Sequence, residues 1–70
     1  MSFSDYVSEL AYEEILKNGG GLRTAEILSS IKDKIPKNYY ISNKRLCQFL
    51  KANPNIENKM DWKGACWYSR

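Results

Sequence analysis

The spacing of apolar residues changes from a helical period to a two-residue alternation at Asn53-Pro54-Asn55. Before these residues, apolar side chains recur every three or four positions, which predicts helices. After them, residues 56–60 alternate between two faces, and a β-prone run at 65–68 follows turn chemistry. We expect Gly64 to take a positive φ, as in a hairpin loop closed by a bulge. The sequence therefore predicts an α+β fold: helices followed by a C-terminal β-hairpin over 56–68.

Three helices are predicted before the hairpin. The first spans 4–17 and stops at the three glycines 19–21, as expected of a helix C-cap. The second has Thr24 as its N-cap and continues until Pro36, which cannot extend a helix. The third covers 42–52 and ends at the Asn-Pro-Asn break. The chain is thus interpreted as one three-helix domain over 1–70 with a terminal hairpin.

The third predicted helix has the clearest pattern. Ser42 is a good N-cap, and Leu46, Phe49 and Leu50 fall within one apolar arc at about 100° per residue. A second arc on the opposite side of the helix carries Lys44, Gln48 and Lys51, with Arg45 on its flank. Such a face is typical of a recognition helix, but lysines on a surface helix also serve solubility alone. The pattern leaves these two interpretations open.

The distribution of charge favours a functional role for that basic face. The net charge is +3, but residues 1–35 hold four basic and six acidic residues, whereas residues 36–70 hold seven basic and two acidic ones. A basic face on a small domain attracts phosphate backbones through electrostatic steering and counterion release. Acidic proteins would be attracted to the same face.

Several classes of function are not expected of this chain. Seventy residues leave little room for a buried catalytic pocket, and there is no histidine to activate a nucleophile. We therefore predict neither an enzyme nor a small-molecule substrate nor a cofactor. Cys47 and Cys66 are interpreted as reduced filler residues, with a disulfide to each other or to a second chain as the alternative. Two cysteines without histidine cannot supply a zinc site.

A membrane location is not expected either. No apolar run approaches the ~20 residues of a membrane span. The N-terminus lacks the basic start and the apolar core of a signal peptide. We expect an intracellular protein of the cytoplasm or the nucleus.

From about Ser4 to Tyr68 the order of these elements resembles the winged helix-turn-helix superfamily. Residues 22–27 are similar to the start of the second helix of such domains, 42–50 to the third helix, and 56–68 to the wing. The glycine-rich approach to the second helix, the long loop before the third and the Asn-Pro-Asn-Ile exit also resemble the HARE-type winged helices. The resemblance implies a three-helix bundle with a C-terminal β-hairpin wing.

The resemblance also implies a function. The third helix would enter the major groove of double-stranded DNA as the recognition helix, and the wing would touch the backbone or the minor groove beside it. Carried over to this sequence, the DNA-binding residues would be Asn43, Lys44, Arg45, Gln48, Lys51, Lys59 and Lys63. Arg, Gln and Asn can read base edges, while lysines neutralise phosphates. We expect a transcription regulator or part of one, acting as a homodimer or within a larger assembly because one small domain offers little contact area.

Two observations support an alternative, a winged helix that docks a protein partner within a larger assembly. The connection over 36–41 is longer than the tight turn of simple helix-turn-helix proteins. Nine aromatic residues also exceed what so small a core readily hides. RNA binding is a further possibility, since the same basic surface would serve it.

The aromatic residues divide into those expected inside and those left open. Trp67 is expected in the core, whereas Trp62 either contacts a partner or folds back on the wing. Tyr39 and Tyr40 either pin the long connection over the helices or contact a partner directly.

Overall fold

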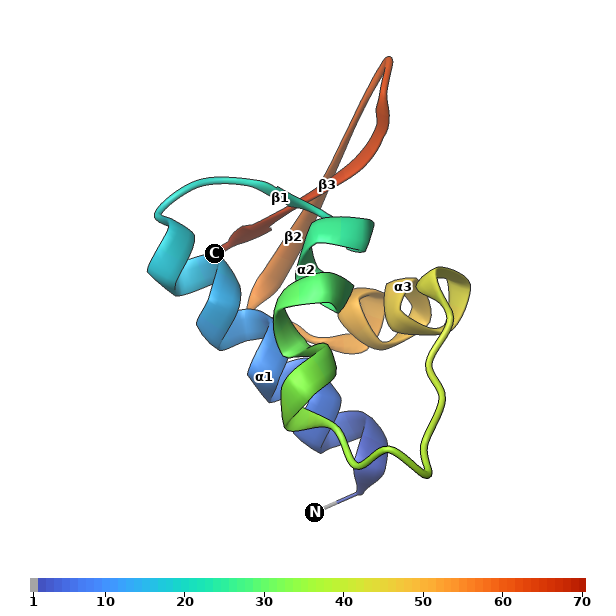
Figure 1. Ribbon diagram of the computed structural model, residues 1–70. Coiled ribbons are helices and arrows are strands. Elements are labelled where there is room, and N and C mark those ends of the chain that lie inside the picture. Colours follow the sequence, from blue (N-terminus) through green and yellow to red (C-terminus); the bar gives the residue numbers. More distant parts are fainter. Residues whose placement is uncertain (1) are drawn as a thin grey trace.

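The computed structural model describes residues 2–70 and consists of three helices followed by a C-terminal hairpin (Figure 1). In chain order the elements are α1 (Phe3–Asn18), β1 (Leu22–Arg23), α2 (Thr24–Ile31), the 3-10 turn η1 (Lys32–Lys34), α3 (Asn43–Ala52), β2 (Ile56–Asp61) and β3 (Gly64–Ser69). The predicted fold class, α+β with three helices and a C-terminal hairpin, is confirmed. In Figure 1 the hairpin extends beyond the helices and ends at the point farthest from the N-terminus.

The three strands form one antiparallel sheet in the order β1-β3-β2. Strands β2 and β3 pair without an inserted residue from Ile56↔Ser69 to Asp61↔Gly64, so the expected bulge is absent. Gly64 has the predicted positive φ, 118°, which glycine adopts readily because it has no Cβ. The edge strand β1 was not predicted, since two residues carry no recognisable alternation.

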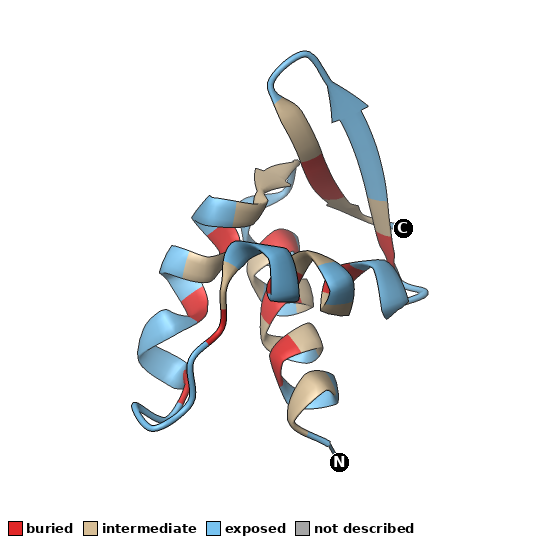
Figure 2. Ribbon diagram, turned by 90° about the vertical axis from the view of Figure 1, so that its right-hand side faces the viewer, coloured by how far each residue is buried: buried red, intermediate tan, exposed pale blue. Residues whose placement is uncertain are grey.

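The helices pack against one face of this sheet, and the buried residues gather where they meet (Figure 2). The core consists of Val7, Ala11, Ile15, Ile27, Ile31, Ile35, Ile41, Leu46, Leu50, Ile56 and Trp67. Trp67, as predicted, is fully buried, and it is the largest of these side chains. Phe3 and Phe49 are partly buried and pack against the core from its edge.

The start of α2 differs from the prediction. Thr24 is the first helical residue rather than the N-cap, and its Oγ1 accepts a hydrogen bond of 2.7 Å from Nε1 of Trp67. The N-cap is Arg23, whose backbone N–H donates to the Glu26 carboxylate over 3.0 Å. The tertiary contact with the indole thus takes the hydroxyl that a cap would have used.

The end of α2 also differs. The α-helix was predicted to continue until Pro36, but it ends at Ile31 and is followed by η1. Ile35 is extended, with ψ at 134°, because the ring of a following proline disfavours the helical conformation. Its side chain nevertheless turns into the core, so the apolar pattern was correct for burial and wrong for helix length.

The long connection between η1 and α3 is attached to α1. The Tyr39 ring stacks on Phe3 with their centroids 4.4 Å apart, and Ile41 is buried in the core. The hydroxyl of Tyr6 donates to the backbone oxygen of Lys34 over 3.1 Å. Tyr39 therefore pins the connection over the helices, whereas Tyr40, which lies between the two anchors, is 84% exposed.

The glycine run provides a test of how closely β1 approaches β3. A Cβ on Gly21 would lie 2.5 Å from Cys66 Sγ and 2.5 Å from Tyr68 Cζ, whereas one on Gly20 would meet nothing nearer than 3.8 Å. Neither glycine has a positive φ, so space alone separates them. We expect Gly21→Ala to lower the free energy of unfolding by about 1–3 kcal/mol, as overpacking does. Gly20→Ala is the matched control and should be neutral or slightly stabilising. Urea unfolding of both variants measures the difference, and equal midpoints would show that β1 does not approach β3 this closely.

Candidate nucleic-acid interface

The helix α3 is fixed by local signals and by its buried side. Ser42 Oγ accepts a hydrogen bond from the backbone N–H of Arg45 over 3.2 Å, which confirms Ser42 as the N-cap. Leu46 and Leu50 have no exposed surface. With one side anchored in the core, the rotation of the helix about its axis is set, and so is the face that it turns to solvent.

The outward face of α3 is basic and uncompensated. Lys44, Gln48 and Lys51 are exposed, and among the interactions of residues 2–70 their side chains form no hydrogen bond and no ion pair. The whole helix contains three basic residues and no acidic one. By contrast, α1 contains four acidic residues and one basic residue. The two helices therefore present opposite charge to solvent.

Arg45 lies on the flank of the exposed arc, on the same side of α3 as Phe49. Its guanidinium is centred 5.9 Å from the Phe49 ring. Phe49 in turn lines a groove together with Asp5 and Glu9 of α1. Arg45 thus lies on the Phe49 side of the helix, away from the middle of the face that carries Lys44 and Lys51.

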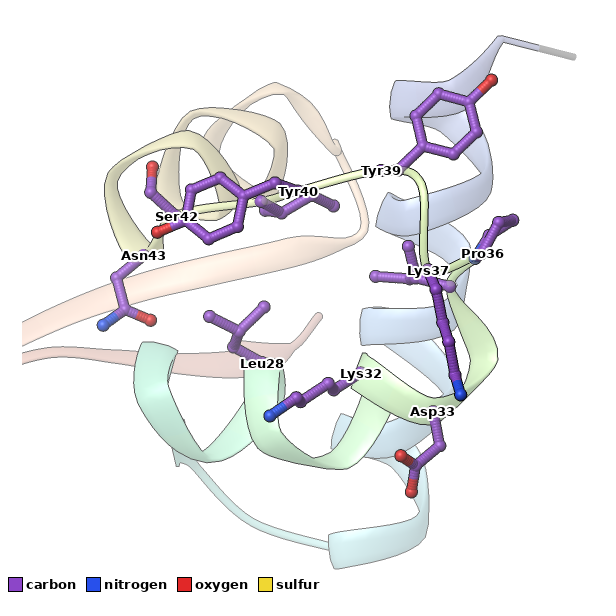
Figure 3. Close-up of a pocket in the computed structure, with 11 residues that line it drawn as sticks. Leu28, Lys32, Asp33, Pro36, Lys37, Tyr39, Tyr40, Ser42 and Asn43 are labelled. Carbon is purple, nitrogen blue, oxygen red and sulfur yellow. The ribbon is translucent and has the colours of Figure 1, made fainter.

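Asn43, the first residue of α3, lines a second groove of about 490 Å³ between α2, η1 and the long connection. Figure 3 shows Leu28 and Lys32 on one side of this groove and Tyr40 on the other. Asn43 is therefore exposed at the start of α3, where it borders this groove.

The two candidate lysines of the wing lie in different places. In the β2–β3 register Asn58 pairs with the buried Trp67, and Lys59 pairs with Cys66. Since neighbouring residues of a strand point to opposite faces, Lys59 projects from the face turned away from the helices, with Nζ 5.1 Å from the Tyr68 ring. Lys63 is in the turn, with Nζ 5.0 Å from the ring of Trp62. The structure therefore does not bring Lys59 onto the α3 side.

An ion pair that was not predicted from the sequence holds the wing to α2. Arg23 donates from Nη1 and Nη2 to the two carboxylate oxygens of Asp61, over 2.9 and 2.6 Å. Its Nη1 also donates to the backbone oxygen of Gly64 over 3.2 Å. Arg23 and Asp61 are 38 positions apart, and no local pattern connects them. Two-point contact of this kind fixes orientation as well as distance.

The same ion pair shifts an acid–base equilibrium. The hydrogen bonds from Arg23 hold the pKa of Asp61 at about 2, below its ordinary value of 3.8. The backbone N–H of Lys63, which donates to Asp61 over 2.8 Å, acts in the same direction. The Asp61 carboxylate is therefore charged, and able to pair with Arg23, at any pH well above 2.

Two further predictions bear on what the protein is. Cys47 is partly buried and Cys66 is buried, and the two form no disulfide with each other. Among residues 2–70, no helix combines the length and the apolar composition that a membrane crossing requires.

Comparison of the chain with protein-family models, curated proteins and solved structures gives no significant match.

The lowered pKa of Asp61 predicts how acid affects the wing. Because the folded pKa lies below the unfolded one, the pair stabilises the fold fully above about pH 4 and is lost as the pH falls toward 2. We expect Asp61→Asn to melt at a lower temperature than the wild type at pH 6. The difference in melting temperature should shrink steadily below pH 4, because protonation of Asp61 removes the ion pair from the wild type. The other carboxylates titrate in both proteins, so their effect cancels. Melting curves followed by circular dichroism test this, and a difference that stays constant down to pH 2 would contradict it.

Proposed function

We propose that this chain is a DNA-binding domain of the winged helix-turn-helix type that acts in transcription regulation inside the cell, with α3 as recognition helix and the β2–β3 hairpin as wing. The observation that carries the proposal is the outward face of α3. There Lys44 and Lys51 flank Gln48 without any acidic neighbour in the helix. Buried Leu46 and Leu50 hold this face in a fixed orientation.

The chemistry of the face suits the major groove of B-DNA. An α-helix fits that groove, where adenine presents the N6 donor and the N7 acceptor that one side-chain amide binds together. Gln48 in the middle of the exposed face is placed for such a contact, and the two lysines on either side would neutralise phosphates. Affinity in this mode comes mostly from released counterions, and base preference from Gln48, with Asn43 at the helix start as a secondary reader.

The wing has a smaller part in this mode of binding. Lys63 at the turn can reach a phosphate beside the major groove, whereas Lys59 projects from the opposite face and adds only long-range attraction. Arg45 sits over Phe49 on the flank of the exposed face, so its contribution to base reading is expected to be less than that of Gln48.

The acidic helix α1 would be turned away from DNA. Glu9 and Glu13 are exposed on it, while Glu14 is paired with Lys34 over 3.2 Å. Since one domain of this size offers little area for specific binding, we propose that α1 is available for a second copy or for another domain of an assembly.

The second candidate function is docking of a protein partner. It is favoured by Tyr40, which is 84% exposed and borders the groove of about 490 Å³ in Figure 3. Lys32 and Lys37 on its rim form no ion pair among the described residues and outnumber Asp33, so an acidic segment would suit it. In an amide-shift titration, DNA binding would perturb residues 44–51 and the wing, whereas a docked protein would perturb residues 32–43.

The lysines of α3 provide the direct test of DNA binding. We expect the double variant Lys44→Ala, Lys51→Ala to bind a duplex of about 15 base pairs more weakly. Its slope of log affinity against log salt should be smaller in magnitude by about 2, one for each lost phosphate contact. Fluorescence anisotropy at several salt concentrations measures both quantities. Lys17→Ala, an exposed lysine at the end of α1, is the control and should leave the slope unchanged.

Base reading requires its own variant. Gln48→Ala should weaken binding to the preferred sequence by about 1–3 kcal/mol and relax the preference, with little change in the salt slope. Selection of bound sequences from a random duplex pool compares it with the wild type. If Gln48→Ala and Arg45→Ala both select the same sequences as the wild type, α3 is not the reading helix.

A further inference from the structure

The tip of the wing exposes two large apolar side chains. Trp62 is 89% exposed and Met60 is 70% exposed, although neither is needed for the core. Of the two alternatives for Trp62, folding back on the wing is contradicted by this exposure, and the tip stands clear of the helices in Figure 2. An indole left in water at the end of a hairpin is a common feature of binding surfaces, where its flat ring provides large contact area at small entropic cost.

The tip is also held in place. Trp62 and Lys63 alone connect the paired residues Asp61 and Gly64, and the Asp61 carboxylate accepts from the Lys63 N–H over 2.8 Å. Arg23 attaches the same carboxylate to the start of α2. A side chain presented from such a turn loses little backbone freedom when it binds a ligand.

The charges at the tip select the kind of ligand. Lys63 Nζ lies 5.0 Å from the Trp62 ring centroid, over one face of the ring, which leaves the other face open. The Asp61 charge beside it is already neutralised by Arg23. An aromatic plate with an adjacent ammonium group matches a single nucleotide, whose base stacks on the ring while its phosphate pairs with the cation.

An intact duplex does not offer that contact. Each paired base is stacked on both faces, and the grooves expose only its edges. The face of a base becomes available where the base is unpaired, as at a bulge, at a mismatch or at the boundary of a single strand. We propose that Trp62 is a stacking platform for an unpaired base, so that the preferred ligand of this domain is duplex DNA with an unpaired base beside the segment bound by α3. The inference rests on the proposed function, since α3 holds the duplex part.

The two tryptophans make this measurable. Trp67 is fully buried and bonded to Thr24, so changes in emission on binding report on the exposed Trp62. Two probes are compared: a blunt duplex of about 15 base pairs, and the same duplex with a short single-stranded 3′ extension. We expect the wild type to bind the extended duplex roughly tenfold more tightly, with quenching of Trp62 that the blunt duplex does not cause.

Variants separate stacking from general stickiness of the tip. Trp62→Ala should lose the tenfold preference and keep its affinity for the blunt duplex, and the unchanged emission of Trp67 verifies that it is folded. Trp62→Phe should keep part of the preference. Met60→Ala, which removes an exposed apolar side chain next to the turn but no ring, should keep all of it.

Three results would overturn the proposal. Equal affinity for the two probes, with salt-dependent binding to both, removes the stacking role and leaves DNA binding by α3 standing. No binding to either probe at low salt removes the stacking role and the proposed function together. A blue shift of Trp62 emission with phosphatidylserine–phosphatidylcholine vesicles, without preference for the extended duplex, would assign the tip to a membrane surface instead.

Discussion

Burial of the Trp67 indole joins the hairpin to the helices, and the other tertiary features of the fold depend on it. Trp67 lies in the central strand β3, opposite Leu22 of β1 and Asn58 of β2. Its ring fills the space above the helices, and its Nε1 is bonded to Thr24 at the start of α2. In a domain of 70 residues, where little apolar surface is available for burial, one side chain of this size has a large share of the core.

The orientation of Trp67 determines which residues the outer face of the sheet carries. Because side chains alternate along a strand, an inward Trp67 places Cys66 outward, and the register then puts Arg23 and Lys59 on that same outer face. Asp61, two residues beyond Lys59, shares it as well. The Arg23–Asp61 pair can form only because the sheet register brings both residues to one face. Attachment of the wing is therefore a consequence of how the core is filled.

The sequence predicted those parts of the fold that depend on neighbours along the chain. The cap, the apolar arc and the exposed lysines of α3 all follow from residues within one or two turns, so α3 and its outward face were predicted correctly. The features that were missed depend on distant partners. The Thr24 hydroxyl binds the indole of Trp67, which is 43 positions away, and the N-cap is one residue earlier than predicted. The strand β1 exists only because β3 pairs with it. The outward orientation of Lys59, by contrast, agrees with the predicted alternation of residues 56–60, in which Lys59 lies on the face opposite the buried Ile56.

The uneven distribution of charge over the surface would favour the approach of a polyanion from one side. Acidic residues are concentrated on α1, and Asp5 and Glu9 line the groove that separates α1 from Phe49 and the end of α3. A phosphate backbone is repelled by these carboxylates. The basic side chains that would attract a phosphate backbone are those of Lys44 and Lys51 on α3 and Lys63 at the tip of the wing. Under the proposals above, a duplex would contact the lysines of α3, and an unpaired base would contact Trp62 at the tip.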